Sequence, residues 1–256
     1  MNALATNRPS NAPWNKLQRA ASDLKETPDQ LLHVDGVRWD IENLPNGKTT
    51  DNGVFSDAYV NPAKVKDVFL VVKRFTERPG NLPGHALLGF EFQPDAPVTS
   101  SQGQKDSGLV LSVDFRYREG EEFDPVQSIE DPHPIIYQLG TWSDAIEKAT
   151  IHDANPMQKY KLKLNDEQKT SLLKERLAAA AADHTTDMYH PVTNSCLSTL
   201  IDGVNKVVPE KQRIPHNAPD GSPDVAATVP IWCSSTFRSH GLLAQLSPTV
   251  IPANPK

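Results

Sequence analysis

The sequence has little of what several common protein classes require. It contains only two cysteines, Cys196 and Cys233, among 256 residues, so at most one disulfide can form, and we expect two free thiols. No cysteine or histidine pair has the spacing of a zinc site, and phosphate-cradling glycine loops and Gly-x-Ser-x-Gly turns are absent. No apolar run approaches the roughly 20 residues that cross a membrane as a helix. We therefore expect no metal or other cofactor and no transmembrane segment.

Basic charge is also scarce. The formal net charge is -6, and no basic stretch is interleaved with aromatic residues, which argues against a nucleic-acid-binding protein. Hydrophobic residues make up 38% of the chain and 22 residues are proline, so long loops around one compact domain are expected. Residues 1–18 contain no apolar core of a secretory signal, which leaves two alternatives: a signal has been removed, or export follows another route.

The most informative stretch is 189–208, YHPVTNSCLSTLIDGVNKVV, which predicts an amphipathic helix. Its apolar residues recur at spacings of three and four and form one stripe: Leu197, Leu200, Ile201, Val204, Val207 and Val208. Asn194 and Ser195 precede this stripe and suit a helix N-cap. Cys196 therefore falls in the first helical turn, at the edge of the stripe and half-covered.

A cysteine in a first helical turn has a specific chemistry. The unpaired N–H groups and the positive end of the helix dipole favour the thiolate, so we expect the pKa of Cys196 to lie well below about 8.5. A thiolate is a nucleophile that works with a nearby base. The alternative interpretation is that Cys196 is a small buried hydrophobic residue, as most free cysteines are.

His85 is the histidine best placed to be that base. It follows a Pro/Gly-rich turn and opens an apolar run, 86–92, that predicts a buried strand. A second strand is predicted over 109–116. If the two strands pair with Phe92 opposite Leu109, His85 lies opposite Arg116, and Asp114 lies one diagonal step away on the same face.

These segments carry a family resemblance. In chain order they are HALLGFEF, GLVLSVDFRYREGEEFDP, PIIYQLGTWSDAIEKA, YKLKL and YHPVTNSC. Together they resemble the family of N-terminal periplasmic domains of the lipoprotein N-acyltransferase Lnb, over about half of the chain, from Pro83 to Val208. The sequence departs from the family pattern at three points: Asp114 stands where the family has Glu, Ser195 separates Asn194 from Cys196, and no Arg follows the Asp segment.

The resemblance implies an α+β fold, with an antiparallel sheet packed on helices in a circularly permuted papain-like arrangement of the NlpC/P60 kind. It implies Cys196 as nucleophile, His85 as general base and Asp114 as orienting acid. The residues expected to support the site or bind substrate are Tyr189, Asn194, Ser195 and Arg116. The oxyanion is expected to be held by N–H groups at the helix start.

The resemblance also implies a function. We expect a cysteine-dependent acyltransferase acting on a lipid or lipoprotein of the cell envelope, located in the periplasm or envelope. A thiol hydrolase that cleaves peptidoglycan or a lipid ester, including a secreted one, is the first alternative. A non-catalytic binding module with a vestigial triad is the second. Neither the acyl donor, the acceptor nor the oligomeric state follows from the sequence.

The remaining segments are expected to flank the thiol domain or to add further strands and helices to it. We predict an N-terminal arm with a short helix at 14–24 (residues 1–30), the thiol domain (31–210), and a Pro-rich loop with a tail that packs on the domain (211–256). Further strands are predicted at 32–39, 68–75, 135–139 and 157–164, the last half-exposed or at an edge. Further helices are predicted at 142–149 and 167–182, with a final short helix drawn from IWCSSTF and GLLAQL. The EGEEFD stretch is interpreted as a solvated acidic turn rather than a calcium loop.

Overall fold

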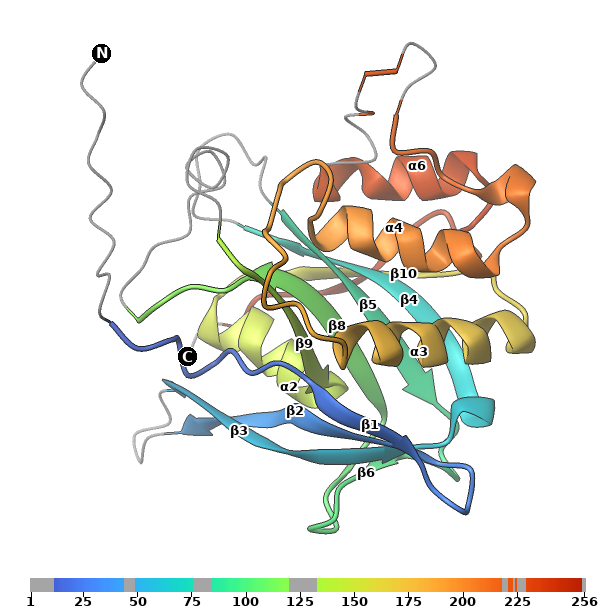
Figure 1. Cartoon of the computed structure of the whole chain (residues 1–256). Helices are drawn as coiled ribbons and strands as arrows, with labels where there is room; N and C mark the ends of the chain where they lie inside the picture. Colours follow the sequence, from blue (N-terminus) through green and yellow to red (C-terminus); the bar gives the residue numbers. More distant parts are fainter. Residues whose placement is uncertain are drawn as a thin grey trace, which may run out of the picture.

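One large mixed sheet organises the molecule (Figure 1). The structure, a computed structural model, describes residues 12–43, 49–75, 84–119, 133–217, 221–222, 224 and 229–254. Within these residues the sheet has 11 strands in the order β11-β10-β4-β5-β8-β9-β2-β3-β6-β7, and β1 pairs with β2. Nearly all neighbouring strands are antiparallel, and β2 pairs with β9 in parallel.

Four apolar strands form the centre of the sheet. They are β4 (Val65–Arg74), β5 (Gly84–Phe92), β8 (Gly108–Phe115) and β9 (Ile135–Thr141). Their β-branched, leucine and aromatic residues fit a pleated surface that is covered on both faces. The central strands are buried along most of their length, so they form a rigid platform for the polar residues among them.

The remaining strands extend the sheet on both sides. On one side lie β2 (Leu32–Asn43), β1 (Ser22–Glu26), β3 (Thr49–Val60), β6 (Val98–Thr99) and β7 (Lys105–Asp106). On the other side lie β10 (Met157–Lys161) and β11 (Thr249–Ile251). A 3-10 turn, η1 (Pro62–Lys64), connects β3 to β4. Because β11 pairs with β10, the C-terminal residues are part of the same sheet.

Helices cover both faces of the sheet. α3 (Asp166–Ala180), α4 (Cys196–Val207) and α6 (Cys233–Ser239) lie together on one face (Figure 1). The opposite face carries α2 (Trp142–Glu147), which continues into a π-helical turn, η2 (Lys148–His152). Short 3-10 turns, η3 (Glu210–Gln212) and η4 (Pro230–Trp232), follow α4 and precede α6. The fold is therefore α+β.

The two faces of β5 contribute to different cores, because successive side chains of a strand point to opposite sides. Ala86, Leu88 and Phe90 belong to the main core, together with the apolar residues of α3 and α4. Leu87 packs against a smaller cluster of Phe69, Val71, Ala149 and Met157 under α2 and η2. Even-numbered residues of β5 thus face α4, and odd-numbered residues face α2.

Several sequence predictions are confirmed. The helix predicted at 167–182 is α3, capped by Asn165, whose side chain accepts from the Gln168 N–H at 2.8 Å. The helix after Tyr189 is α4, and four residues of the predicted stripe, Leu197, Leu200, Ile201 and Val204, are buried in it. The strands predicted at 32–39, 68–75 and 135–139 correspond to β2, β4 and β9. Both cysteines are free and buried.

Other predictions are wrong. No helix forms at 14–24: β1 pairs with β2, and Trp14 forms a bridge with Arg118, so neighbouring strands satisfy the backbone groups there. The strand predicted at 157–164, half-exposed or at an edge, is β10; it is half-exposed but not at an edge, since it lies between β4 and β11. GLLAQL is not helical, and its Leu243 bridges to Leu162. The acidic EGEEFD turn lies outside the described residues.

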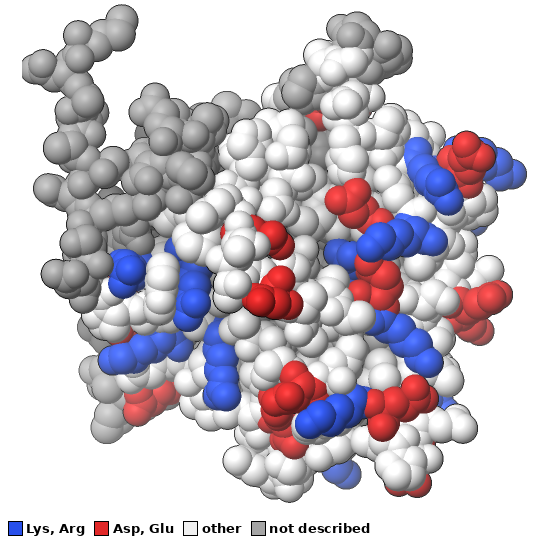
Figure 2. Space-filling model, in the orientation of Figure 1, with Lys and Arg blue, Asp and Glu red and all other residues white. Residues whose placement is uncertain are grey.

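Charges on the surface are interleaved. Figure 2 shows Lys and Arg side chains beside Asp and Glu on the face that α3 covers. Lys206 and Glu175 are paired at 2.6 Å and Lys64 and Asp95 at 2.9 Å. Exposed pairs of this kind contribute little to stability. Among the helices that the structure describes, none combines the length and apolar character needed to cross a membrane.

Candidate functional site

Cys196 is the first residue of α4. Ser195 is the N-cap: its Oγ accepts from the Ser198 N–H at 3.3 Å, and its own N–H donates to Ser198 Oγ at 2.7 Å. This reciprocal pair fixes where the helix begins. Asn194 does not cap the helix, because its amide donates to the Met188 carbonyl at 2.9 Å and its backbone pairs with His190. Asn194 instead shapes the turn that leads into the helix.

The Cys196 thiol is buried, with 4% of the residue exposed. Burial raises its pKa to about 12, and the negative charge of Asp114 acts in the same direction. The backbone N–H groups of Ala86, Leu197 and Cys196 itself favour the thiolate but do not offset burial. The expectation of a lowered pKa is therefore wrong, and Cys196 rests as a neutral thiol.

Tyr189 lies next to this thiol. Burial raises the pKa of Tyr189, and its interaction with Cys196 and the charge of Asp114 raise that pKa further. The Tyr189 ring packs edge-on against Phe115 at 5.5 Å between centroids, and its backbone N–H donates to the His133 carbonyl at 2.8 Å. The tyrosine is thus held in place and helps to seal the thiol from water.

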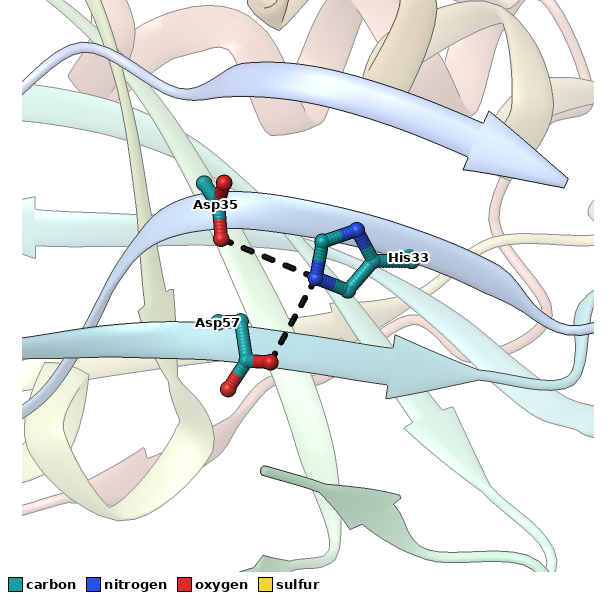
Figure 3. A group of neighbouring side chains, drawn as sticks. All are labelled: His33, Asp35 and Asp57. Carbon is teal, nitrogen blue, oxygen red and sulfur yellow. Dashed lines mark ion pairs between the residues drawn. The ribbon is translucent and has the colours of Figure 1, made fainter. Parts of the chain in front are cut away.

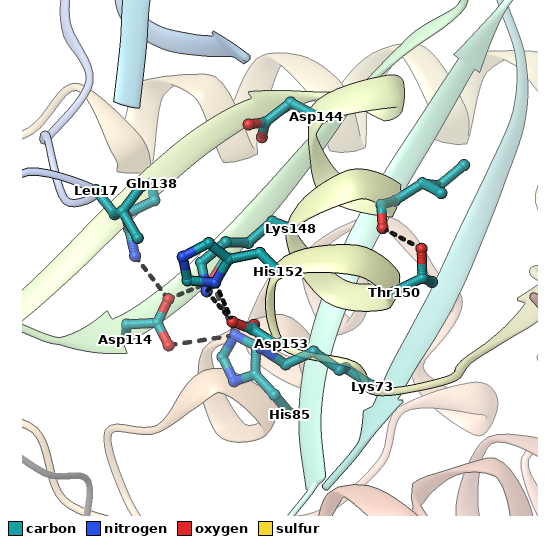
Figure 4. A network of polar contacts seen from close by, with 12 residues as sticks. Leu17, Lys73, His85, Asp114, Gln138, Asp144, Lys148, Thr150, His152 and Asp153 are labelled. Carbon is teal, nitrogen blue, oxygen red and sulfur yellow. Dashed lines mark hydrogen bonds and ion pairs between the residues drawn. The ribbon is translucent and has the colours of Figure 1, made fainter. Parts of the chain in front are cut away.

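His85 and Asp114 lie together on the other face of the sheet (Figure 4). His85 Nε2 is 2.8 Å from Ser112 Oγ and 3.3 Å from Asp114 Oδ1. Ser112 Oγ donates to Asp114 Oδ2 at 2.5 Å, and Gln138 Nε2 donates to the same oxygen at 2.7 Å. Because the Ser112 hydroxyl donates to Asp114, it accepts from His85 Nε2–H. This tautomer leaves the lone pair on Nδ1 as the basic site of the ring.

The predicted strand register differs from the observed one by two residues. Phe90, rather than Phe92, pairs with Leu109, and the pairing of β5 with β8 ends at Leu87 and Ser112. A shift by two keeps every side chain on its expected face, so Asp114 still lies beside His85. Arg116 is not opposite His85.

Arg116 instead follows β8 and turns toward the N-terminal segment. Its guanidinium carbon lies 4.5 Å from the centroid of the Trp14 ring, and Arg118 lies over the same ring at 4.3 Å. Arg116 Nε is buried without a hydrogen-bond partner among the residues that the structure describes. Arg116 thus supports the N-terminal segment through Trp14 rather than facing His85.

The thiol and the imidazole lie on opposite faces of β5. Cys196 belongs to the main core with Ala86, whereas His85 shares its face with Leu87 and Ser112. Within the described part of the chain, no hydrogen bond joins the Cys196 thiol to the His85 ring. The two are nevertheless neighbours along the strand, because the Ala86 N–H contacts the thiol and Ala86 directly follows His85. Because successive side chains of a strand point to opposite faces, a local change of the β5 backbone at His85 is needed to bring the ring nitrogen to the sulfur.

A cavity of about 110 Å³, lined by both polar and apolar side chains, opens beside His85. Lys73 and Lys148 line it, and both bind Asp153, Lys73 Nζ at 3.0 Å from Oδ2. Burial lowers the pKa of Lys148 to about 8. Burial also lowers the pKa of His85, and Lys73 adds to this effect while Asp114 opposes it. His85 is therefore neutral near pH 7 and able to accept a proton.

Sequence reasoning missed four residues around His85 and Asp114. Ser112 and Gln138 hydrogen-bond the pair, and Lys73 and Lys148 line the cavity beside it. A signal for two of them exists in the strand pattern. Lys73 pairs with His85 across β4 and β5, and Gln138 pairs with Ser112 across β8 and β9. Lys73 directly follows the apolar run 68–72 of β4, and Gln138 interrupts the apolar residues of β9; polar residues on one face of neighbouring strands are expected to meet.

Fold and site define an α+β domain with a buried thiol, Cys196, at the start of α4 and a His-Asp pair on the neighbouring strands β5 and β8. The sequence profile of the family described as the Lnb N-terminal periplasmic domain matches residues 54–223. The match covers well over half of the chain, and the protein belongs to this family. Its periplasmic designation fits a location in the periplasm or cell envelope. No curated protein and no solved structure matches the chain.

Proposed function

We propose that this protein is a cysteine-dependent acyltransferase that acts on a lipid or lipoprotein of the cell envelope. In this proposal Cys196 is the nucleophile, His85 the general base and Asp114 the residue that orients the base. The observation that supports the proposal is that two consecutive residues of β5 connect the site. The Ala86 N–H contacts the thiol, and the preceding residue, His85, is paired with Asp114. Membership of the family and its resemblance to a lipoprotein acyltransferase supply the substrate class.

The protonation states at rest define the first step. Cys196 carries its proton and His85 Nδ1 carries a lone pair. As Sγ attacks the carbonyl carbon of the donor ester, the thiol proton passes to Nδ1, and Asp114 stabilises the imidazolium that forms. The ester C–O bond then breaks, the leaving alcohol takes the proton from His85, and a thioester remains on Cys196.

The start of α4 offers donors for the oxyanion. The backbone N–H groups of Ala86, Cys196 and Leu197 all point at the sulfur closely enough to favour its charged form. The same groups suit the negative oxygen of a tetrahedral intermediate. An acceptor amine, deprotonated by His85, then attacks the thioester and releases Cys196.

Burial of the thiol favours transfer over hydrolysis. Only 4% of Cys196 is exposed, and Tyr189 closes one side of it. Water therefore has poor access to a thioester at this position, whereas an acceptor that binds to the protein brings its amine with it. The order of the chain, with the histidine strand before the cysteine helix, supports the permuted papain-like arrangement that we propose for the site.

A non-catalytic binding domain is the second candidate. It is favoured by one observation: the thiol rests with a raised pKa and, among the described residues, makes no hydrogen bond to His85. In that case Cys196 is only a small apolar residue in the main core. The two candidates differ in whether a covalent acyl-enzyme forms.

The experiment uses the whole chain with phospholipid vesicles as donor and a synthetic peptide with a free N-terminal amine, bearing a lipidated cysteine, as acceptor. Mass spectrometry reads the acylated peptide and the acylated Cys196. Cys196→Ala and His85→Ala should each lower turnover by about 1,000-fold or more, since the members of one catalytic unit fail together. Cys233→Ala, which removes the other buried thiol, is the matched control and should retain turnover.

Four results distinguish the possible functions. A thioester on Cys196 with transfer to the amine supports the acyltransferase, and a thioester that yields only free fatty acid supports a hydrolase. Turnover that persists in Cys196→Ala refutes the thiol mechanism. Vesicle binding by wild type without any acyl-enzyme establishes the binding domain instead.

A further inference from the structure

Three potential metal ligands meet on β2 and β3, away from the cavity beside His85 (Figure 3). They are His33 and Asp35 on β2 and Asp57 on β3. His33 Nε2 is 3.6 Å from Asp35 Oδ1 and 3.4 Å from Asp57 Oδ2. The three ligand atoms all lie within 4.8 Å of one another.

We propose that His33, Asp35 and Asp57 bind a divalent transition-metal ion of the zinc class. The distances carry the proposal. A charge-assisted hydrogen bond between an imidazolium and a carboxylate is about 2.7–2.9 Å long, and both separations at His33 exceed that range. Zinc lies about 2.0–2.2 Å from imidazole nitrogen and carboxylate oxygen, so two ligands of a tetrahedral ion are separated by about 3.3–3.6 Å. The observed separations therefore match those between two ligands of a bound zinc ion, and not a direct hydrogen bond.

Repulsion between the Asp35 and Asp57 carboxylates also favours a bound cation. Val34 pairs with Ala58 across the two strands, which brings the next residues, Asp35 and Asp57, close together. Like charges in this position destabilise a strand pair. An imidazole binds a metal ion in its neutral form, so the ligand set carries the two carboxylate charges, which a divalent ion neutralises.

Hydrogen bonds orient the Asp57 carboxylate, which also interacts with His33 and Tyr59. Asp57 Oδ1 accepts from the Ser101 N–H at 2.9 Å, from Ser101 Oγ at 2.9 Å and from Ser56 Oγ at 3.1 Å. Its other oxygen, Oδ2, faces His33. The His33 ring packs on Tyr59 with 4.7 Å between centroids. Outer partners of this kind fix ligand orientation in metal sites.

The donor set selects the kind of ion. One imidazole and two carboxylates suit zinc and its neighbours, whereas calcium and magnesium take oxygen ligands. The ligand side chains of His33, Asp35 and Asp57 are 18%, 38% and 11% exposed, so water reaches the ion and completes its coordination. The ion connects β2, β3 and the turn at Ser101.

The test starts from chelator-treated full-length protein and uses Co²⁺ and Zn²⁺ alone as probes. Co²⁺ should give the intense visible absorption of a four-coordinate site. Zn²⁺ at about 100 times its dissociation constant should raise the melting temperature by about 5–10 °C. His33→Ala and Asp57→Asn should lose both effects. His216→Ala, which removes a histidine paired with the single carboxylate of Asp202 at 2.7 Å, is the control and should keep both.

Three outcomes overturn the proposal. One is wild-type protein that shows neither the Co²⁺ absorption nor the Zn²⁺ stabilisation. Another is a His33→Ala variant that retains both, because the ion then binds elsewhere. The third is equal stabilisation by Mg²⁺ or Ca²⁺, which excludes a zinc-class site. Asp35→Asn, at the most exposed ligand, separates loss of metal binding from loss of folding. Its circular dichroism spectrum without metal should equal that of wild type, while its affinity for Co²⁺ should fall.

Discussion

The ionisation of Cys196 gives the sharpest test of the site. Burial raises the pKa of this thiol to about 12. At pH 8 such a thiol is ionised in about one molecule in 10,000, whereas a cysteine with an ordinary pKa of about 8.5 is ionised in roughly a quarter. The thiolate population of Cys196 is therefore lower by about 2,000-fold. Restricted access to the buried sulfur slows alkylation further.

The assay is alkylation by iodoacetamide, followed by mass spectrometry of peptides, which reads Cys196 and Cys233 separately. Between about pH 7 and about pH 10 the Cys196 rate should rise tenfold per pH unit without a plateau, because the thiolate fraction does so below the pKa. The absence of a plateau reports the pKa even though access lowers the absolute rate. Urea-unfolded protein supplies the reference, with a plateau above about pH 8.5.

A charge variant separates the causes of the shift. Asp114→Asn removes a negative charge that raises the pKa of Cys196, so this variant should alkylate faster than wild type at each pH. Asp166→Asn, at the exposed start of α3, is the control and should match wild type. A wild-type plateau below about pH 8.5 would refute the reasoning, because it would mean that the helix amides outweigh burial.

Two further predictions concern stability. Arg38→Met should lower the free energy of unfolding by about 3–5 kcal/mol in a urea titration, because it leaves the fully buried Asp144 carboxylate without its two hydrogen bonds of 2.7 and 3.0 Å. Lys66→Met, in a largely exposed pair, should cost less than about 1 kcal/mol, and equal losses would contradict the prediction. Gly89→Ala should cost about 1–3 kcal/mol by overpacking, since its Cβ would lie 2.3 Å from Trp142 Cζ3; an unchanged melting temperature would be inconsistent with this contact.

The sequence predicted those features that depend on local pattern. The apolar stripe after Cys196 specified α4, since a period of 3.6 has only one buried face. The pairing predicted for β5 and β8 placed His85 and Asp114 on one face of the sheet. Both residues lie on that face although the predicted register is wrong by two residues. Motif order was sufficient to identify the family.

Features that depend on pairing between distant segments were not predictable. The irregularities between Val34 and Val37 set which residues of β2 oppose β3, so the meeting of His33 and Asp57 could not be read from spacing, and no metal site was expected. The pKa of Cys196 depends on how deeply tertiary packing buries the thiol, which outweighed the local effect of the helix start. The segment at 14–24 has helical periodicity, yet pairing of β1 with β2 prevailed.

The pairing of β5 with β8 ends before the pairing of β5 with β4, and this difference affects the local stability of β5. Beyond Leu87 and Ser112, β5 is tied to β4 alone, through Ala86, His85 and Gly84. A strand bonded on one side opens at lower free energy than one bonded on both, and amide hydrogen exchange measures that difference residue by residue. The amide of Gly84 should therefore exchange faster than that of Leu88, and the stretch that carries His85 is the part of the central sheet that opens most readily. In the proposed mechanism, substrate entry and the movement of the imidazole toward the sulfur would share this one local opening, while the rest of the sheet stays closed.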